Sequence, residues 1–138
     1  MPKMKSMGKG IKILILDDER DICKFSKELF VKRGFDAYTA LTGKSAINTV
    51  KRIKPQIAIL DIYLQGEVDG IEVLKFIKEN QPNCFCIMVT REDDKEMIEK
   101  VRQLGAADYL TKPLTVRELD RAVNKVSSKI RKEAKRDG

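Results

Sequence analysis

Five side chains of the kinds used in phosphoryl chemistry each follow a short apolar run. Asp17 and Asp18 follow "ILIL", and Asp61 follows "IAIL". Thr90 follows "CIMV", and Lys112 comes shortly after "DYL". In an open parallel sheet, ligands bind beyond the carboxyl ends of the strands. If these runs are strands of one such sheet, three carboxylates, a hydroxyl and an ammonium meet at a single edge.

This set of side chains predicts a metal-assisted phosphoryl site. Three converging carboxylates repel one another unless a cation lies between them. Oxygen ligands without His or Cys favour a hard cation that keeps several waters, which indicates Mg²⁺. A metal and an ammonium neutralise phosphoryl oxygens, and a carboxylate can act as the nucleophile. A single acid at a strand end is usually an ordinary loop residue, so the prediction depends on the combination.

The elements that must position these residues alternate along the chain. Five apolar runs predict strands, and they are Ile11–Leu16, Ala37–Ala40, Ile57–Leu60, Cys84–Val89 and Ala107–Leu110. Helical spacing between and after them gives five apolar stripes, which are Ile22/Phe25/Leu29/Phe30, Ala46/Ile47/Val50, Ile71/Leu74/Ile77, Met97/Ile98/Val101/Leu104 and Leu119/Val123/Val126/Ile130. Five strands alternating with five helices predict an α/β fold with a mostly parallel central sheet.

The composition is that of one globular domain. The chain has 138 residues, of which 42% are hydrophobic. Its apolar runs are too short to cross a bilayer, and its basic start lacks the apolar segment of a signal peptide, so we expect a cytoplasmic protein without membrane insertion. The three cysteines, with no His in the chain, favour free thiols packed in the core over a disulfide framework or a zinc site.

The net charge of +7 belongs to the ends of the chain. Residues 1–16 carry +4, residues 125–138 carry +4, and the part between them nets −1. We therefore expect a basic N-terminal extension over residues 1–10 and a basic C-terminal tail over residues 131–138. A run such as "KIRKEAKR" is more often a solvated helix end than a nucleic-acid or membrane patch, and no aromatic residue is interleaved with it.

Several motifs together resemble the receiver domain of two-component response regulators. They are "LILDDE", "GFDAYTALTGKSAI", "IAILDIYL", "DGIEVLKFIK", "MVTREDD" and "GAADYLTKPLTVREL", and they follow the family's order. The resemblance covers about residues 11–130. It implies a flavodoxin-like, doubly wound parallel sheet with five strands in the order 2-1-3-4-5.

The resemblance also implies roles for individual residues. Asp61 would accept the phosphoryl group. Mg²⁺ would be bound by Asp17, Asp18 and Asp61, with the backbone carbonyl of Tyr63 as a further ligand. The protein would be a phosphoacceptor that assists its own phosphorylation and slow dephosphorylation, and not an enzyme acting on other substrates.

Five further features follow from the same resemblance. Lys112 would contact the phosphoryl group, and the Lys112–Pro113 bond would be cis. Thr90 would close on the phosphoryl group, and Tyr109 would rotate inward with it. Tyr63, Arg91 and Glu92 would flank the approach of the hydrolytic water.

The chain departs from the family pattern in two ways. The loop "DIYLQGEVDG" lacks the proline common after the phosphoacceptor and is about one residue longer. No output domain follows the fifth helix, which favours a stand-alone receiver. The alternatives are a receiver cut from a longer regulator with a DNA-binding or enzymatic output, and a nucleic-acid binder that uses its basic tail.

Partners follow from the same resemblance. The resemblance implies a phosphohistidine donor, either a histidine kinase or a histidine phosphotransfer protein. This donor would be a separate protein, because this chain contains no His. A downstream protein or an output domain would bind the face formed by the fourth helix, fifth strand and fifth helix, at about residues 94–130. Nucleic acid would be bound only through an absent output domain or through the basic tail.

Overall fold

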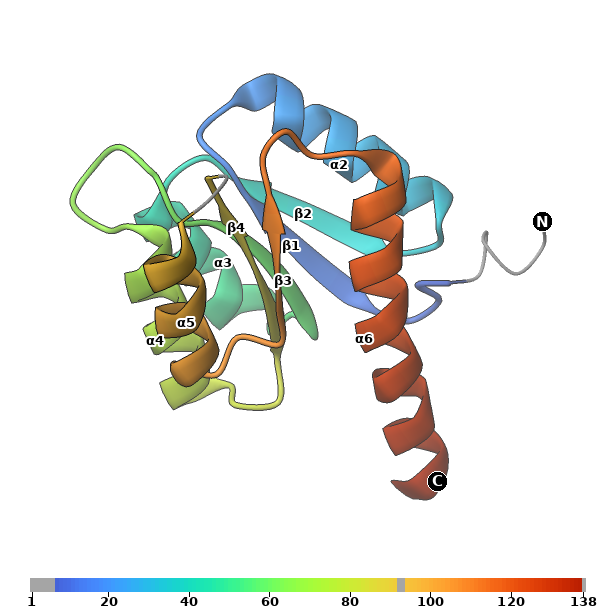
Figure 1. Ribbon diagram of the computed structural model, residues 1–138. Coiled ribbons are helices and arrows are strands. Elements are labelled where there is room, and N and C mark those ends of the chain that lie inside the picture. Colours follow the sequence, from blue (N-terminus) through green and yellow to red (C-terminus); the bar gives the residue numbers. More distant parts are fainter. Residues whose placement is uncertain (1–6, 92–93, 138) are drawn as a thin grey trace.

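The computed structural model describes residues 7–91 and 94–137 and contains one parallel sheet. Its strands are β1 (Lys12–Leu16), β2 (Asp36–Ala40), β3 (Ile57–Asp61), β4 (Phe85–Thr90) and β5 (Asp108–Thr111). They lie in the order β2-β1-β3-β4-β5, and every neighbouring pair is parallel (Figure 1). The predicted fold and strand order are confirmed, and the strand ends differ from the predicted ones by at most one residue.

Five helices cover the two faces of the sheet. They are α2 (Arg20–Lys32), α3 (Gly43–Ile53), α4 (Gly70–Asn80), α5 (Lys95–Gln103) and α6 (Val116–Asp137). Helices α2 and α6 pack on one face, and α3, α4 and α5 pack on the other (Figure 1). Because both faces are covered, β3 is buried throughout and β1 and β4 are buried beyond their first residues, which explains their apolar runs.

Side chains of β1 show how one strand serves both layers. Ile13 and Ile15 belong to the core on the α2/α6 side, whereas Leu14 and Leu16 belong to the core on the other side. Successive strand residues point to opposite faces, so the apolar run fills both cores. The same strand therefore ends in a fixed position, with Asp17 directly beyond it.

The predicted apolar stripe of the first helix is wrong at Phe25. This side chain is 47% exposed, whereas Cys23 and Ser26 are on the buried side of α2. The Cys23 thiol donates a hydrogen bond to the Asp17 carbonyl at 3.3 Å, which is compatible with a small buried residue at this point. The prediction used only the spacing of apolar residues. It therefore placed the Phe25 ring in the core and did not consider that a small polar residue such as Ser26 could be buried instead.

The three cysteines are buried and free, as predicted. Burial raises the pKa of the Cys23 thiol to about 11, so this thiol stays protonated at neutral pH. Cys84 and Cys86 lie in the core beside α3, α4 and α5. Their position agrees with core packing.

Both predicted basic ends make contacts with the domain. Met7 is buried in the core with Phe35, and the Arg131 guanidinium donates a hydrogen bond to the Met7 carbonyl. Helix α6 continues to Asp137, through most of the predicted tail, and projects past the sheet (Figure 1). Residues 1–6 and 138 of these two segments lie outside the described residues. Within the described part of the chain, no helix is both long and apolar enough to cross a membrane.

Candidate metal and phosphoryl-transfer site

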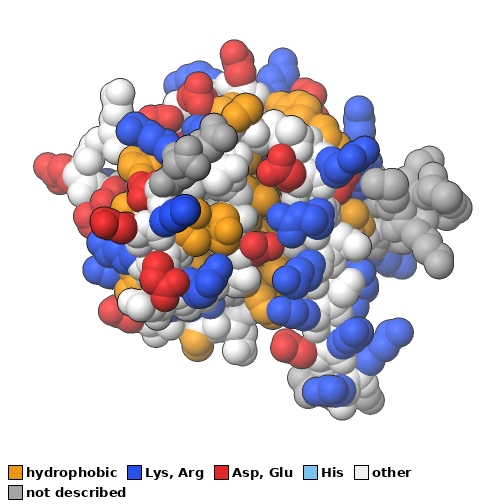
Figure 2. Space-filling model, viewed as in Figure 1, with side chains coloured by type: hydrophobic (Ala, Val, Ile, Leu, Met, Phe, Trp, Pro, Cys, Tyr) orange, Lys and Arg blue, Asp and Glu red, His pale blue; other side chains and the backbone are white. Residues whose placement is uncertain are grey.

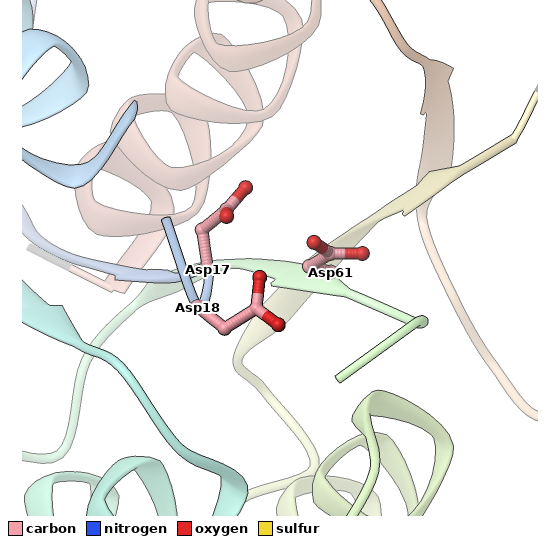
Figure 3. Close-up of side chains that lie close together, drawn as sticks. All are labelled: Asp17, Asp18 and Asp61. Carbon is pink, nitrogen blue, oxygen red and sulfur yellow. The ribbon is translucent and has the colours of Figure 1, made fainter. Parts of the chain in front are cut away.

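Three carboxylates gather at the carboxyl ends of two neighbouring strands. Leu16 pairs with Leu60 in the sheet, so Asp17 and Asp61, the next residues, come side by side. Asp17, Asp18 and Asp61 each offer an oxygen within 4.8 Å of the others (Figure 3). The sheet register thus brings together the three acids that the sequence places after strands.

Lys112 links this cluster to the far edge of the sheet. Its backbone N–H donates to the Thr90 carbonyl at 3.0 Å, which fixes the chain where β5 ends. Its ammonium lies 2.9 Å from Asp61 Oδ2 and 3.3 Å from Asp17 Oδ2. Burial alone would lower the pKa of Lys112, but the hydrogen bond and charge of Asp61, with Asp17, raise the pKa above its ordinary value. The side chain is therefore a stable cation.

Two of the acids, Asp17 and Asp61, have raised pKa values. Burial raises the pKa of Asp17, and the charge of Asp61 raises it further, although Lys112 opposes both effects. Burial also raises the pKa of Asp61, again opposed by Lys112. Removing two nearby carboxylates from water is unfavourable unless positive charge compensates.

The donor set fits a hard divalent cation. Glu19 adds a fourth carboxylate, 3.2 Å from the Lys112 ammonium. Four carboxylates and one ammonium leave a net charge of −3 when all are ionised. Every candidate ligand atom is an oxygen, which suits Mg²⁺.

The loop after Asp61 folds back toward its carboxylate. The Tyr63 N–H donates to Asp61 Oδ1 at 3.0 Å, and Lys112 donates to Oδ2, so both carboxylate oxygens have partners. At the other end of the loop, a Cβ on Gly70 would lie 2.1 Å from the Asp61 carbonyl oxygen. Only glycine allows this close approach, and the Asp69 side chain then caps α4 by accepting from the Glu72 N–H.

The two predicted switch residues lie on β4 and β5, and Thr90 directly follows Val89, which pairs with Asp61 in the sheet. Thr90 is buried at the end of β4, and its hydroxyl donates to the Arg91 carbonyl at 3.0 Å. Tyr109 is half-buried and lines a cavity of about 320 Å³ that Ile98 and Lys125 also line. The cavity is bordered by α5, β5 and α6, so Tyr109 faces the predicted partner surface.

The contacts of two acidic residues, Glu19 and Asp94, were not predicted from the sequence. Glu19 binds Lys112, and its only sequence signal is its position directly after the acidic pair. Asp94 accepts a hydrogen bond from the Tyr63 hydroxyl and caps α5 through the Met97 N–H. The Arg91 guanidinium lies 4.2 Å from the centre of the Tyr63 ring. Glu92, predicted beside them, lies outside the described residues.

An apolar groove opens beside the Lys112 side chain. Its volume is about 500 Å³, and its lining residues are Glu19, Ile22, Phe25, Ser26, Lys112, Pro113 and Leu114. The Lys112–Pro113 peptide bond is cis, as the resemblance implies. The exposed ring of Phe25 therefore belongs to a surface that also includes Lys112, and not to the core.

Comparisons with known proteins agree with this geometry. Residues 13–124 match the model of the response regulator receiver domain. The chain is 35% identical over 114 residues to the sporulation initiation phosphotransferase F of Bacillus subtilis, with 83% of this chain and 91% of that protein covered.

Two solved structures show the range of chains that contain this fold. The signal receiver domain of a putative Luxo repressor protein from Vibrio parahaemolyticus has a TM-score of 0.84 at 26% identity, covering 93% of this chain and 98% of that chain. NtrX from Brucella abortus has a TM-score of 0.78 at 29% identity, covering 90% of this chain but 29% of that chain.

Proposed function

Because the chain belongs to the response regulator receiver domain family, we propose that it relays a two-component signal as a stand-alone receiver, by reversible phosphorylation of Asp61. The observation that carries the proposal is the position of the Asp61 carboxylate. It is buried at the end of β3, it has an oxygen within 4.8 Å of oxygens of two further carboxylates, and it forms an ion pair with the Lys112 ammonium. A nucleophile, a cation and a metal-ligand set therefore share one edge of the sheet.

Mg²⁺ would be held by Asp17, Asp18 and Asp61, with the Tyr63 backbone carbonyl as a further ligand. When bound, it would supply positive charge to the oxygens of the incoming phosphoryl group. Asp18 is exposed, whereas Asp17 and Asp61 are buried, so the set is open to solvent on one side. Solvent access there agrees with a Mg²⁺ ion that keeps several of its waters.

The phosphoryl step needs a nucleophile and an electrostatic partner from this chain. An Asp61 oxygen forms a bond to phosphorus while the bond from phosphorus to the histidine nitrogen of the donor protein breaks, and the electron pair of that bond leaves with the imidazole. The Lys112 ammonium moves its hydrogen bond from Asp61 to a phosphoryl oxygen. The Tyr63 N–H holds Asp61 Oδ1 in position throughout.

The donor protein would dock in the apolar groove beside Lys112. A phosphohistidine must come within bonding distance of Asp61, so its carrier must cover the surface around that residue. The groove is lined by Phe25, Ile22 and Leu114 and reaches the side chain that contacts Asp61. Exposed aromatic and aliphatic side chains of this kind are typical of protein contacts.

A downstream partner would recognise the phosphorylated state at the face formed by α5, β5 and α6. A phosphoryl group on Asp61 gives the Thr90 hydroxyl a stronger acceptor than the Arg91 carbonyl that it now uses. Movement of Thr90 leaves space that Tyr109 can fill, which changes the cavity surface where a downstream partner would bind. We place these events in the cytoplasm, where the three free thiols stay reduced.

The direct test is labelling with a small phosphodonor. The full chain is incubated with acetyl phosphate, with and without Mg²⁺, and the intact mass is measured. We expect an added phosphoryl mass that needs Mg²⁺ and that Asp61→Asn abolishes. Asp36→Asn, a control at an exposed carboxylate of β2, should be labelled like the parent. Equal labelling of the Asp61→Asn variant would reject the proposal.

The second candidate is a receiver that belongs to a longer regulator. The match to only 29% of NtrX shows that a receiver can be a small part of a longer protein. The match to 91% of the phosphotransferase supports the stand-alone form. Mass measurement of the protein isolated from its source cells separates the two, because a regulator with an output domain would be far heavier than 15.8 kDa.

A further inference from the structure

The exposed side of α6 carries a continuous row of cations, here called the basic row. Its members are Arg121, Lys125, Lys129, Lys132 and Arg136, and all five are exposed. Residues three or four apart lie on the same side of a helix, so these side chains follow one another along it. The row extends along α6 for about 22 Å at a rise of about 1.5 Å per residue. Figure 2 shows Lys and Arg side chains gathered along this helix.

The members of the basic row have few ion pairs, although one exposed acid, Glu133, lies four residues after Lys129 and three before Arg136. Arg121 is 3.5 Å from Asp108, and no other member has an ion pair within the described part of the chain. Each member also has a like-charged neighbour three or four residues away, an arrangement that destabilises an isolated helix by a few tenths of a kcal/mol per pair. A ligand that carries negative charges at the same spacing would remove this repulsion along the whole row.

The other side of α6 is packed against the domain. Leu119, Val123 and Val126 are buried in the core, so only one side of the helix is accessible before the helix projects past the sheet. A duplex major groove, about 12 Å wide, admits a helix that can contact the groove on both flanks. The domain prevents such an entry beside Arg121 and Lys125, where the opposite side of α6 is buried. The strands of a duplex also curve away from a straight line of cations.

We propose that the basic row binds an acidic helical segment of a protein partner. A helix with carboxylates four residues apart repeats about every 6 Å, which is the spacing of the row. Near its start, the row passes the cavity that Lys125 and Tyr109 line, where an apolar side chain of the same segment can enter beside Ile98. The choice of a protein partner rests on the proposed function, but the binding itself does not require phosphorylated Asp61.

The experiment measures binding of two probes to the full chain at near-physiological salt. One is a synthetic alanine-based peptide with Glu at every fourth position and the length of α6, and the other is duplex DNA of the same length. The variant Lys129→Gln/Lys132→Gln/Arg136→Gln removes three charges from the basic row. The control Lys24→Gln/Lys27→Gln/Lys32→Gln removes three charges from exposed positions of α2.

We expect the row variant to weaken peptide binding by about tenfold, as three exposed ion pairs would, and the α2 control to bind like the parent. Labelling by acetyl phosphate should be unchanged in both, which separates this test from that of the proposed function. An equal loss in both variants would mean non-specific attraction and would overturn the proposal. Tighter binding of duplex DNA than of the peptide would overturn it in favour of a nucleic-acid partner.

Discussion

The Lys112 ammonium lies 2.9 Å from Asp61 Oδ2 although the two residues are 51 positions apart in the chain. The same ammonium contacts Asp17 and Glu19, so one cation is shared by three acids. A metal and a phosphoryl group entering this site would therefore meet an existing ion network and rearrange it.

Replacing Lys112 should make stability depend on metal. Without the ammonium, Asp17 and Asp61 lose their main compensating charge, so Lys112→Met should lower the free energy of unfolding by about 1 kcal/mol in the absence of Mg²⁺. We keep this value small because Lys112 is 30% exposed and solvent screens the pair. Added Mg²⁺ should raise the melting temperature more in the variant than in the parent.

Thermal unfolding with EDTA and with Mg²⁺ measures both effects. Lys129→Met, at an exposed position of α6, is the matched control and should respond to Mg²⁺ like the parent. An identical response of Lys112→Met and its control would show that the ammonium does not compensate the acidic cluster.

Removing Asp18 should separate metal binding from folding. Asp18 is exposed and repels two buried acids, so Asp18→Ala relieves repulsion in the metal-free protein while deleting one ligand oxygen. We expect an unchanged or higher melting temperature in EDTA and a loss of Mg²⁺ binding in calorimetric titration. Asp21→Ala, in the first turn of α2, should bind Mg²⁺ like the parent. A clearly lower melting temperature of Asp18→Ala in EDTA would contradict the expectation.

Phosphorylation should change one face of the molecule. Under the proposed function, Thr90 and Tyr109 would transmit the change at Asp61 to the surface of α5, β5 and α6, at about residues 94–130. We therefore expect altered amide hydrogen exchange there after treatment with acetyl phosphate, and no such change in Asp61→Asn. Altered exchange confined to α2 and α3 would place the response on the opposite part of the fold.

The end of α6 should be dispensable for phosphorylation. Residues 132–136 are exposed, whereas Arg131 bonds to the Met7 carbonyl and to Ser128. Deleting residues 132–138 should leave the rate of labelling by acetyl phosphate within about twofold of the parent, because the deleted residues lie outside the site. A severe loss of labelling, with intact folding by circular dichroism, would show that this end supports the site.

Sequence patterns predicted which residues stand at strand ends, but they did not predict the side-chain contacts made between loops. The apolar runs before Asp17 and Asp61 predict strands, and the resemblance to the receiver domain implies that these two strands are neighbours, so that their ends meet. The contacts of Asp94 could not be predicted, because they depend on how the loop after β3 folds against the loop after β4. Phe25 was wrongly assigned to the core, because an apolar residue at helical spacing can line a surface groove as well as the core.

The last prediction concerns the lifetime of the aspartyl phosphate. Its hydrolysis needs a water in line with phosphorus, on the side away from the Asp61 oxygen. The ring of Tyr63 is held between the Arg91 guanidinium and Asp94, so two large side chains are fixed beside the acceptor loop. We expect them to obstruct the water. Tyr63→Asn/Arg91→Ala should lose phosphate about tenfold faster than the parent, which is ~1.4 kcal/mol in barrier.

Two further variants identify what obstructs the water. Tyr63→Phe keeps the bulk of the ring but loses the hydrogen bond to Asp94, so its phosphate should decay nearly as slowly as that of the parent. Tyr38→Asn, a matched loss of a ring at β2, should leave the decay unchanged. The measurement is the fall in phosphorylated mass after acetyl phosphate is removed. If the double variant holds its phosphate as long as the parent, then these side chains do not control access of the water, and solvent must reach phosphorus by a path that neither ring nor guanidinium covers.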